Sequence, residues 1–471
     1  MRRQLLWFKQ DLRLDDHPAV QAALGADRVL PVFILDPRWL QVTPFGTRPL
    51  GVHRAGFLLE SLQALDGELR RRDSRLLVLH GEAERLIPEL VASLGLDEVL
   101  TLDELVPDEL QRLARVRQAL DIPLRLLPDN GLLRADELPC APNRLPQTFS
   151  RFRTLIERRL QVFQPPSAPE RLPALPEGSE DWLQPLPLLA QLGLGEPQGL
   201  AYSGFPFAGG EPAAQARLRD YLWQGQGVGD YQASQEWLGR ESSSKLSPWL
   251  AHGSLSPRRV VAELRRYEAQ HGRSESTQAF WSALLWRDFF RWALRRHGEA
   301  LFAPGGVKAT VRAPRQVDER YSRWCQGRTG MPLVDACMRE LAATGYLPHR
   351  GRQVAASYLV SDLQQDWRHG AAWFAEHLID HEDASNWGNW AYLAGVASDP
   401  RRQQAFNALR QARRYDPDAT YVSLWLPELR TLPVALRHTP FQLSPLQLDA
   451  MRYPRLERIP DAWRPYLGEA A

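Results

Sequence analysis

Short runs of apolar residues alternate with longer amphipathic stretches along the first third of the chain. The apolar runs are typical of buried strands, and they span Leu5–Lys9, Val29–Asp36, Leu76–His80, Glu98–Leu102 and Leu124–Leu127. The stretches between them repeat apolar residues at helical spacing, and they include His53–Arg71, Ala83–Leu94 and Asp108–Ala119. Alternating strands and helices predict a parallel sheet with helices on both faces. We therefore expect an N-terminal doubly wound α/β domain over residues 1–135.

The pattern changes after this domain. Prolines recur between residues 164 and 210 with little periodicity, which is typical of a long surface connector. Beyond them strand signals nearly vanish, and the expected helices are Ala213–Trp223, Pro257–Ala269, Thr277–His297, Met331–Thr344, Gln353–Gln364, Ala371–Ile379 and Asp399–Ala412. We expect a connector over residues 136–210 and an all-α domain over residues 211–471.

Composition narrows the classes of protein that these domains can form. The net charge is +2, and almost every cation is arginine, since Lys9, Lys245 and Lys308 are the only lysines. Schiff-base and phosphate-loop lysine chemistry therefore have few possible sites. The three cysteines form no CxxC pair, which argues against a zinc or disulfide framework and suits the reducing cytoplasm. We expect no signal peptide and no membrane span, because no apolar run approaches about 18 residues.

Two segments carry side chains suited to a bound cofactor. Residues 242–249 read Ser-Ser-Ser-Lys-Leu-Ser-Pro-Trp. Serines at a helix start, together with Lys245, either hold a diphosphate or simply cap the helix. Trp286 and Arg287 are neighbours in a stretch rich in aromatic residues and arginine. One face of such a helix can be buried while the other offers cations.

The segment from residue 349 to residue 392 holds further candidates. Arg352 and Asp380 are complementary, and they form either part of a ligand site or a purely structural ion pair. His377 and His381 have the spacing of metal ligands on one helix face, but no other His or Cys cluster accompanies them, so we expect no metal. Four tryptophans lie close in sequence and either pack in the core or carry electrons: Trp367, Trp373, Trp387 and Trp390.

Several motifs in this chain, taken in order, resemble those of the photolyase/cryptochrome family. They are Trp7–Leu14, Lys245–Leu250, Leu285–Phe290, Thr329–Ala336 and Trp425–Leu429. They span almost the whole chain, and their joint occurrence is specific to the family. Within it, His349-Arg350-Gly351-Arg352-Gln353 and the stretch from Ile379 to Trp390 resemble the cryptochrome DASH subgroup.

The resemblance implies an N-terminal antenna domain and a C-terminal helical domain that binds FAD. The residues that match FAD contacts are Tyr231, Ser243, Ser244, Lys245, Leu246, Ser247, Arg287, Arg352, Asp380, Glu382 and Asn386. Asn386 matches the residue that faces flavin N5, while Trp390 and Trp367 match the first two members of the electron-transfer chain. Glu104 matches the acid that holds a 5,10-methenyltetrahydrofolate antenna in DASH proteins.

The resemblance also implies light-driven repair of cyclobutane pyrimidine dimers in DNA. In family photolyases, reduced flavin absorbs blue light and passes an electron to a flipped-out dimer, which is extracted most cheaply from single-stranded DNA. DASH members are associated with single-stranded DNA and with photoreception. The residues that match the lesion pocket are Trp286, His349, Gln353 and Tyr392.

Three positions depart from the family pattern. Ala283 stands where the family has a glutamate that hydrogen-bonds the dimer, and His349 replaces an asparagine at the pocket rim. Pro314 stands where the family has its outer tryptophan, ten residues before Trp324. Electrons would have to leave through another ring, and Tyr321 and Trp324 are the candidates.

Three hypotheses about function follow from these observations. The first is a DASH-type blue-light photoreceptor that binds FAD and repairs dimers in single-stranded DNA. The second is a fully competent DNA photolyase, which Ala283 disfavours. The third is a non-enzymatic light-signalling or nucleic-acid-binding flavoprotein. We expect a monomer with single-stranded rather than duplex DNA as its partner.

Overall fold

The structure is a computed structural model that describes residues 1–158, 163–196, 205–239, 243–310, 316–398 and 406–467. Its strands are β1 Arg3–Phe8, β2 Arg28–Leu35, β3 Leu77–His80, β4 Glu98–Leu102 and β5 Leu124–Leu127. Its α-helices are α1 Pro18–Ala23, α2 Val52–Arg70, α3 Ala83–Leu94, α4 Pro107–Gln118, α5 Phe149–Glu157, α6 Glu211–Arg219, α7 Tyr231–Ser234, α8 Ser247–Ala251, α9 Pro257–His271, α10 Glu275–His297, α11 Glu319–Cys325, α12 Pro332–Thr344, α13 His349–Ser357, α14 Trp367–His377, α15 Asp383–Leu393, α16 Ala408–Tyr415, α17 Thr420–Trp425, α18 Val434–Arg437 and α19 Pro445–Ala450.

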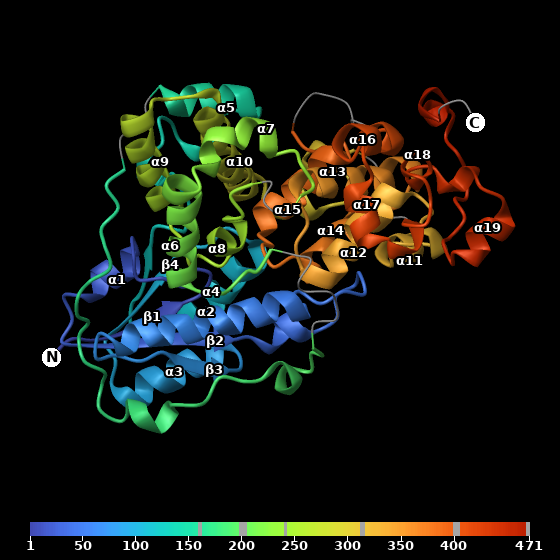
Figure 1. Cartoon of the computed structure of the whole chain (residues 1–471). Coiled ribbons are helices and arrows are strands. Elements are labelled where there is room, and N and C mark those ends of the chain that lie inside the picture. The colour runs from blue at the N-terminus through green and yellow to red at the C-terminus, as the bar shows by residue number, and fades with distance from the viewer. Residues whose placement is uncertain (159–162, 197–204, 240–242, 311–315, 399–405, 468–471) are drawn as a thin grey trace.

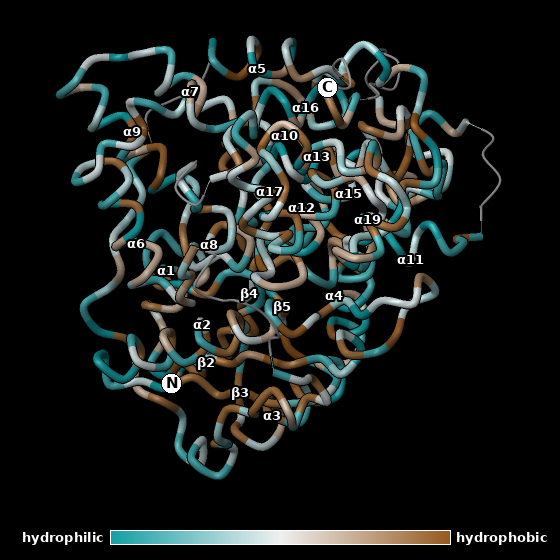
Figure 2. Tube along the Cα trace, turned by 45° about the vertical axis from the view of Figure 1, so that its right-hand side comes forward, coloured by the Kyte–Doolittle hydropathy of each residue, from teal (hydrophilic) through white to brown (hydrophobic). Residues whose placement is uncertain are grey.

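A five-stranded parallel sheet forms the core of the N-terminal part, in the order β3-β2-β1-β4-β5. Successive side chains of a strand point to opposite faces. On β1, Leu6 and Phe8 pack with α1 and α2, whereas Leu5 and Trp7 pack with α3 and α4. Figure 2 shows these strands as mostly hydrophobic along their length. The predicted doubly wound sheet is therefore confirmed, and each predicted strand lies within two residues of the observed one.

The rest of the chain is helical, and within the described residues no strand follows β5. Two cores lie there, and α10 contributes to both, through Trp281 and Leu285 on one side and Phe290 and Leu294 on the other. Figure 1 shows α10 above the sheet, in the lobe of the helical part that also holds α5 and α9. Every predicted helix is observed, although residues 399–405 of the last one lie outside the described residues. No helix is predicted over α15, although it is central to the site.

Buried polar contacts fix the helical part against the sheet. The guanidinium of Arg13 donates to Asn130 Oδ1 at 2.7 Å and to the carbonyl of Gly253 at 2.8 Å. Asp15 accepts from Arg259 of α9 through both carboxylate oxygens, at 2.8 and 2.7 Å. The side chains on both sides of these contacts are largely buried. The contacts therefore fix the position of the helices relative to the sheet.

The segment predicted as a connector includes an α-helix. It contains α5, whose Phe152 is buried and contacts Phe289 of α10 at 5.5 Å between ring centroids. The boundaries of the three predicted regions remain predictions. None of the helices in the described ranges is long and apolar enough to cross a bilayer.

A glycine of α15 lies against a phenylalanine of α10, and this contact gives a stability prediction. A Cβ on Gly388 would lie 2.3 Å from Phe290 Cδ1. We expect Gly388→Ala to destabilise the fold by about 1–3 kcal/mol, because the helices must move apart. Gly67→Ala in α2 is the control, since nothing lies within 4 Å of its Cβ position and alanine favours a helix by up to about 1 kcal/mol. Thermal unfolding midpoints test this, and a Gly388→Ala midpoint at or above that of Gly67→Ala would contradict it.

Candidate cofactor site and antenna pocket

A buried carboxylate joins α10 to the start of α15. Glu382 Oε1 accepts from Arg287 and from Arg291, each at 2.8 Å, and its Oε2 accepts from Ser385 Oγ at 2.8 Å. Burial opposes ionisation of Glu382, but the two arginines hold the pKa of its carboxyl group below the usual range. Both carboxylate oxygens of Glu382 already accept hydrogen bonds from the protein. Among the residues predicted to contact FAD, Glu382 therefore serves to position Arg287.

A second ion pair lies between α13 and the segment before α15. Arg352 donates from one Nη to both oxygens of Asp380, at 3.0 and 2.7 Å, and from Nε to the carbonyl of Leu347 at 2.7 Å. The Asp380 side chain is almost fully enclosed, with 2% of its surface exposed. The structure therefore brings together the Arg352–Asp380 pair that the sequence predicted.

The serine-rich turn carries a buried cation. Lys245 is 3% exposed and adopts a φ of 59°, which is uncommon outside glycine. Its ammonium lies 4.6 Å from the centroid of the Tyr346 ring, and no ion pair is formed with it by the described residues. The carbonyls of Ser243 and Ser244 accept from Arg217 at 3.3 and 2.9 Å. This turn therefore offers a buried cation that forms no direct ion pair within the described ranges, although the carboxyl group of Glu340 interacts with it electrostatically.

The other predicted diphosphate and ribityl contacts lie near this turn. Leu246 is buried directly before α8, and Ser247 is the first residue of that helix. Tyr231 begins α7 and is buried against Phe280 of α10, with ring centroids 5.3 Å apart. Burial raises the pKa of the Tyr231 hydroxyl, so it stays protonated and can donate a hydrogen bond.

Buried polar atoms without partners test whether a polar cofactor fits. Gln353 Oε1, Arg350 Nε and His381 Nδ1 are buried, and no hydrogen bond reaches them from the described residues. Gln353 and Arg350 flank Arg352, while His381 follows Asp380. Native proteins rarely leave such atoms unpaired. These orphan donors and acceptors, together with the buried cation Lys245, fit a polar, anionic cofactor such as FAD.

The predicted electron-transfer residues lie on α14 and α15. Asn386 donates from Nδ2 to the carbonyl of Ala371 at 2.9 Å, which fixes its amide against α14. Trp390 is 2% exposed, and the Cβ position of Gly370 lies 2.3 Å from its Cη2. Trp367 lies one turn before Gly370 and donates from Nε1 to the carbonyl of Pro304 at 3.2 Å. The structure thus brings Trp390 against the helix that carries Trp367.

The predicted lesion side is built from aromatic rings. Trp286 and Tyr392 meet at 6.5 Å between centroids, with their planes at 74°. Ala283 and His349 are both exposed. Phe149 of α5 stacks on Trp286 at 3.8 Å and 11°. Sequence reasoning missed Phe149, because it lies in the segment predicted as a connector.

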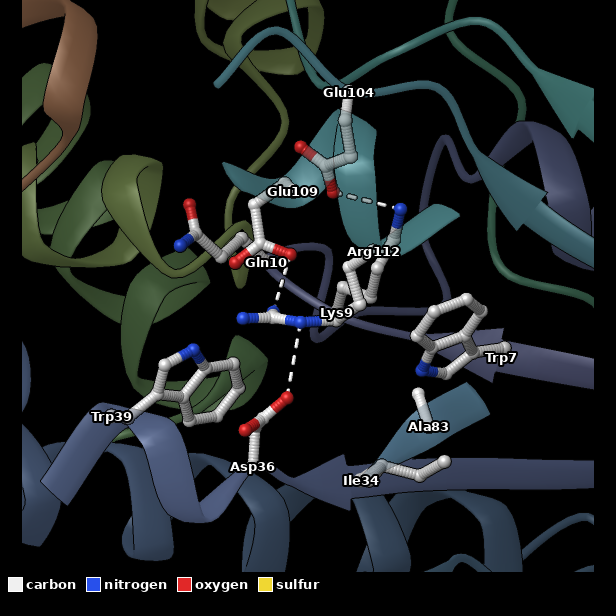
Figure 3. Close-up of a pocket in the computed structure, with 10 residues that line it drawn as sticks. All are labelled: Trp7, Lys9, Gln10, Ile34, Asp36, Trp39, Ala83, Glu104, Glu109 and Arg112. Carbon is white, nitrogen blue, oxygen red and sulfur yellow. Dashed lines mark hydrogen bonds and ion pairs between the residues drawn. The ribbon is translucent and has the colours of Figure 1, made fainter. Parts of the chain in front are cut away.

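Glu104 lies elsewhere, in a pocket of the α/β domain. The pocket opens to solvent, and only about 20 Å³ of it is free for the centres of water-sized molecules, so its side chains leave little room in this structure. Figure 3 shows Glu104 paired with Lys9, at 2.8 Å, and Arg112 between Glu109 and Asp36, at 2.6 and 3.0 Å. Two indoles also line it: Trp7 and Trp39.

The position and chemistry of this pocket suit a ligand. It lies at the carboxyl ends of β1 and β4, where the strand order reverses, and such switch points are the usual ligand crevices of open parallel sheets. Enclosure raises the pKa of Glu104 to about 7, against the opposing effect of Lys9. A carboxyl group with this pKa can donate or accept a hydrogen bond near neutral pH.

Comparisons with known proteins agree with this architecture. Residues 4–175 match the family described as DNA photolyase, and residues 280–459 match the FAD binding domain of DNA photolyase. A cryptochrome DASH from Gloeobacter violaceus is 41% identical over 448 residues, which are 94% of this chain and 89% of that protein. One from Natronomonas pharaonis is 40% identical over 454 residues, which are 94% of each. The crystal structure of a Synechocystis sp. cryptochrome superposes with a TM-score of 0.92 at 35% identity, covering 99% of this chain and 98% of that one.

The chain belongs to the photolyase/cryptochrome family. Its similarity is to members named cryptochrome DASH, as the motifs around Arg352 and Asp380 predicted. FAD is the cofactor of its helical domain, in agreement with the buried cation and the orphan polar atoms described above.

Removing the Lys245 charge tests the anionic part of the cofactor site. We expect Lys245→Met to weaken FAD binding about 10- to 100-fold, because a charge-assisted hydrogen bond contributes about 1.5–3 kcal/mol. Lys308→Met is the matched control, since Lys308 is exposed and donates only to the carbonyl of Gly395 among the described residues. Titration of the flavin-free variants with FAD, followed by flavin fluorescence, gives both affinities. If Lys245→Met and Lys308→Met bound FAD with equal affinity, Lys245 would not be a diphosphate contact.

The raised pKa of Glu104 predicts a pH-dependent stability difference. Its pKa is about 7 in the folded chain against 4.5 for an ordinary glutamate, so its contribution to the free energy of unfolding falls as pH rises between these values. The midpoint of Glu104→Gln relative to wild type should therefore be higher at pH 8 than at pH 5.

Glu84 provides the control for this experiment. Burial opposes its ionisation, but Arg38 and Arg115 hold its pKa at about 2, so it is charged at both pH values. Glu84→Gln should shift the midpoint by the same amount at pH 5 and pH 8. The same result for Glu104→Gln would show that Glu104 is also ionised throughout.

Proposed function

We propose that this chain is a DASH-type blue-light photoreceptor whose light reaction takes place between FAD and the residues of α13, α14 and α15. The observation that carries the proposal is the Arg352–Asp380 ion pair, at 2.7 Å, with Asn386 and Trp390 on the helix that follows it. Bound FAD supplies absorption of blue light and one-electron chemistry at its isoalloxazine ring.

The protein residues have distinct roles in this proposal. Arg352, held by Asp380, places a fixed positive charge beside the ring, where it would favour added negative charge. Asn386, whose amide is fixed by the carbonyl of Ala371, would be available to contact the isoalloxazine ring. Trp390, which is almost fully buried, donates the electron with little solvent reorganisation. Lys245 holds the diphosphate.

We also propose an antenna in the pocket beside Glu104, with 5,10-methenyltetrahydrofolate as its ligand. The carboxyl group of Glu104 would hydrogen-bond the pterin ring, and Trp39 would offer a flat surface for it. The Arg112–Asp36 ion pair forms one wall of the pocket. Support comes from the switch-point position and from the raised pKa of Glu104. Addition of the folate to purified protein should produce bound chromophore in wild type and not in Glu104→Ala.

The second candidate function is repair of cyclobutane pyrimidine dimers in single-stranded DNA. Trp286 and Tyr392 form an aromatic corner for the unstacked bases, and the orphan Gln353 Oε1 offers an acceptor to them. Ala283 provides no carboxyl group for the dimer, and Phe149 already covers one face of Trp286. Repair should therefore be slow, and fastest on single strands because no base pair has to be opened.

The remaining proposals concern the state of the protein in the cell. We propose that it acts as a monomer in the cytoplasm, in accord with three cysteines that form no disulfide. Sedimentation at working concentration tests the first point. We also propose the region boundaries given above, residues 1–135, 136–210 and 211–471, which limited proteolysis tests.

Illumination of the purified protein tests both functions. Wild type should bind FAD and reduce it under blue light with a soluble thiol. The reduced protein should split dimers slowly in single strands and more slowly in duplexes. Ala283→Glu should raise the rate roughly tenfold through one charge-assisted hydrogen bond to the dimer, while Ala283→Leu, which adds bulk without a carboxyl group, should not.

Each outcome separates the hypotheses. Failure to photoreduce bound FAD would overturn the photoreceptor. Rapid turnover on duplex DNA by wild type would favour the fully competent photolyase. Photoreduction without any repair, unchanged in Ala283→Glu, would favour a signalling flavoprotein.

A further inference from the structure

A column of aromatic rings leads from Trp390 toward the surface. Trp390 meets Phe374 at 5.1 Å and Trp324 at 6.3 Å between centroids. Trp324 stacks on Phe374 at 5.9 Å and 14°, and Tyr321 stacks on Trp324 at 6.1 Å and 23°. Tyr321 and Trp324 lie one turn apart on α11, which holds the two rings in register. The exposed fraction is 2% at Trp390, 0% at Trp324 and 9% at Tyr321, so Tyr321 is the most accessible ring of a largely buried column.

The column ends at a partly exposed rim. Tyr321 donates from its hydroxyl to the carbonyl of His369 at 3.2 Å, and the two rings lie 5.6 Å apart. His369 is half-buried and contacts Phe45. The phenol of Tyr321 is itself buried, but the half-buried His369 beside it links this end of the column to the solvent-facing edge of the core.

The branch through Trp367 ends differently. Trp367 meets Trp387 at 5.8 Å, and the further ring contacts of Trp387 within the described residues are with Phe45 and Phe302. Phenylalanine is much harder to oxidise than tryptophan or tyrosine, so this branch stops at Trp387. Pro314, at the family's outer tryptophan position, lies outside the described residues and carries no oxidisable ring.

We propose that Tyr321, reached through Trp324, is the terminal electron donor of this protein. The proposal rests on the FAD photochemistry proposed above. Trp390 gives one electron to photoexcited FAD, Trp324 replaces that electron, and Tyr321 replaces the one lost by Trp324. The phenolic proton of Tyr321 leaves to water, so the balance is one electron gained by the cofactor and one neutral tyrosyl radical. A soluble thiol then returns a hydrogen atom to that radical.

Photoreduction in aromatic variants tests this route. With a thiol in excess, Trp324→Phe and Tyr321→Phe should slow steady FAD photoreduction at least about tenfold, and Trp367→Phe should slow it much less. Tyr321→Phe removes only a hydroxyl, so it preserves the packing even if Trp324→Phe does not fold. Trp281→Phe is the control for a buried tryptophan of α10, with its indole bonded to Glu157.

Radical spectroscopy gives a readout that is independent of turnover. After a light flash, the paramagnetic resonance signal of wild type should narrow when tyrosine is ring-deuterated, and this component should be missing in Tyr321→Phe. A tryptophan radical alone in wild type, or loss of photoreduction in Trp367→Phe but not in Trp324→Phe, would overturn the proposal.

A flavin-free measurement separates this proposal from the proposed function. Azide radicals generated by pulse radiolysis oxidise tryptophan in the apoprotein, and a tyrosyl radical should then form in wild type but much less in Trp324→Phe or Tyr321→Phe. Tyrosyl formation of equal size in all three would refute the route. Electron transfer from Tyr321 to oxidised Trp324 in the apoprotein, without photoreduction of bound FAD, would contradict the proposed function. It would leave the proposed route through Trp324 and Tyr321 supported.

Discussion

The site depends on one buried carboxylate that neutralises two arginines of a neighbouring helix. Glu382 lies directly before α15, and Arg287 and Arg291 are one turn apart on α10. Removing one partner of such a buried group typically costs about 3–5 kcal/mol, because uncompensated charge remains. The contact fixes the first turn of α15 against α10. Asn386 and Trp390 follow one and two turns later on the same helix. Their positions therefore depend on the ion pairs that fix the start of α15.

Two of the charge clusters around the cofactor site are paired within the protein, and one buried cation forms no direct ion pair among the described residues. Glu382 balances α10, and Asp380 balances Arg352. Lys245, by contrast, is enclosed, has a strained backbone and pairs with no carboxylate among the described residues. A buried ammonium in this state is unfavourable until an anion arrives. Binding of an anionic cofactor therefore completes the electrostatics of the fold and stabilises the folded chain by mass action.

The sequence predicted the α/β domain well because hydrophobic periodicity determines it. Every residue from Leu5 to Phe8 is buried, which only a strand covered on both faces explains. It gave no prediction for α15, whose residues Asp383–Leu393 combine two tryptophans with glycine and polar amides and show no apolar stripe. That helix is held by tertiary contacts, such as the approach of Gly388 to Phe290, which no local pattern records.

The same division applies to the site. The ion pair between Arg352 and Asp380 could be predicted from the sequence, because the two residues carry opposite charges and lie in motifs that match the family. The stacking of Phe149 on Trp286 could not, since the two residues are far apart in sequence and Phe149 lies in a proline-rich, weakly periodic region. Likewise, the loss of the family's outer tryptophan at Pro314 made Trp324 a candidate for electron transfer, but its stacking between Tyr321 and Phe374 is a property of how α11 packs against α14.

α15 also separates the electron side of the site from the side that would face DNA. Trp390 and Tyr392 are two residues apart, so on a helix their side chains point to nearly opposite faces. Trp390 contacts Phe374 and Trp324 in the core, whereas Tyr392 meets Trp286. A change on one face, such as the loss of a carboxylate at Ala283, leaves the contacts of the other unaltered. Light absorption and electron uptake can therefore persist in this chain whether or not its outer face still accepts a damaged base.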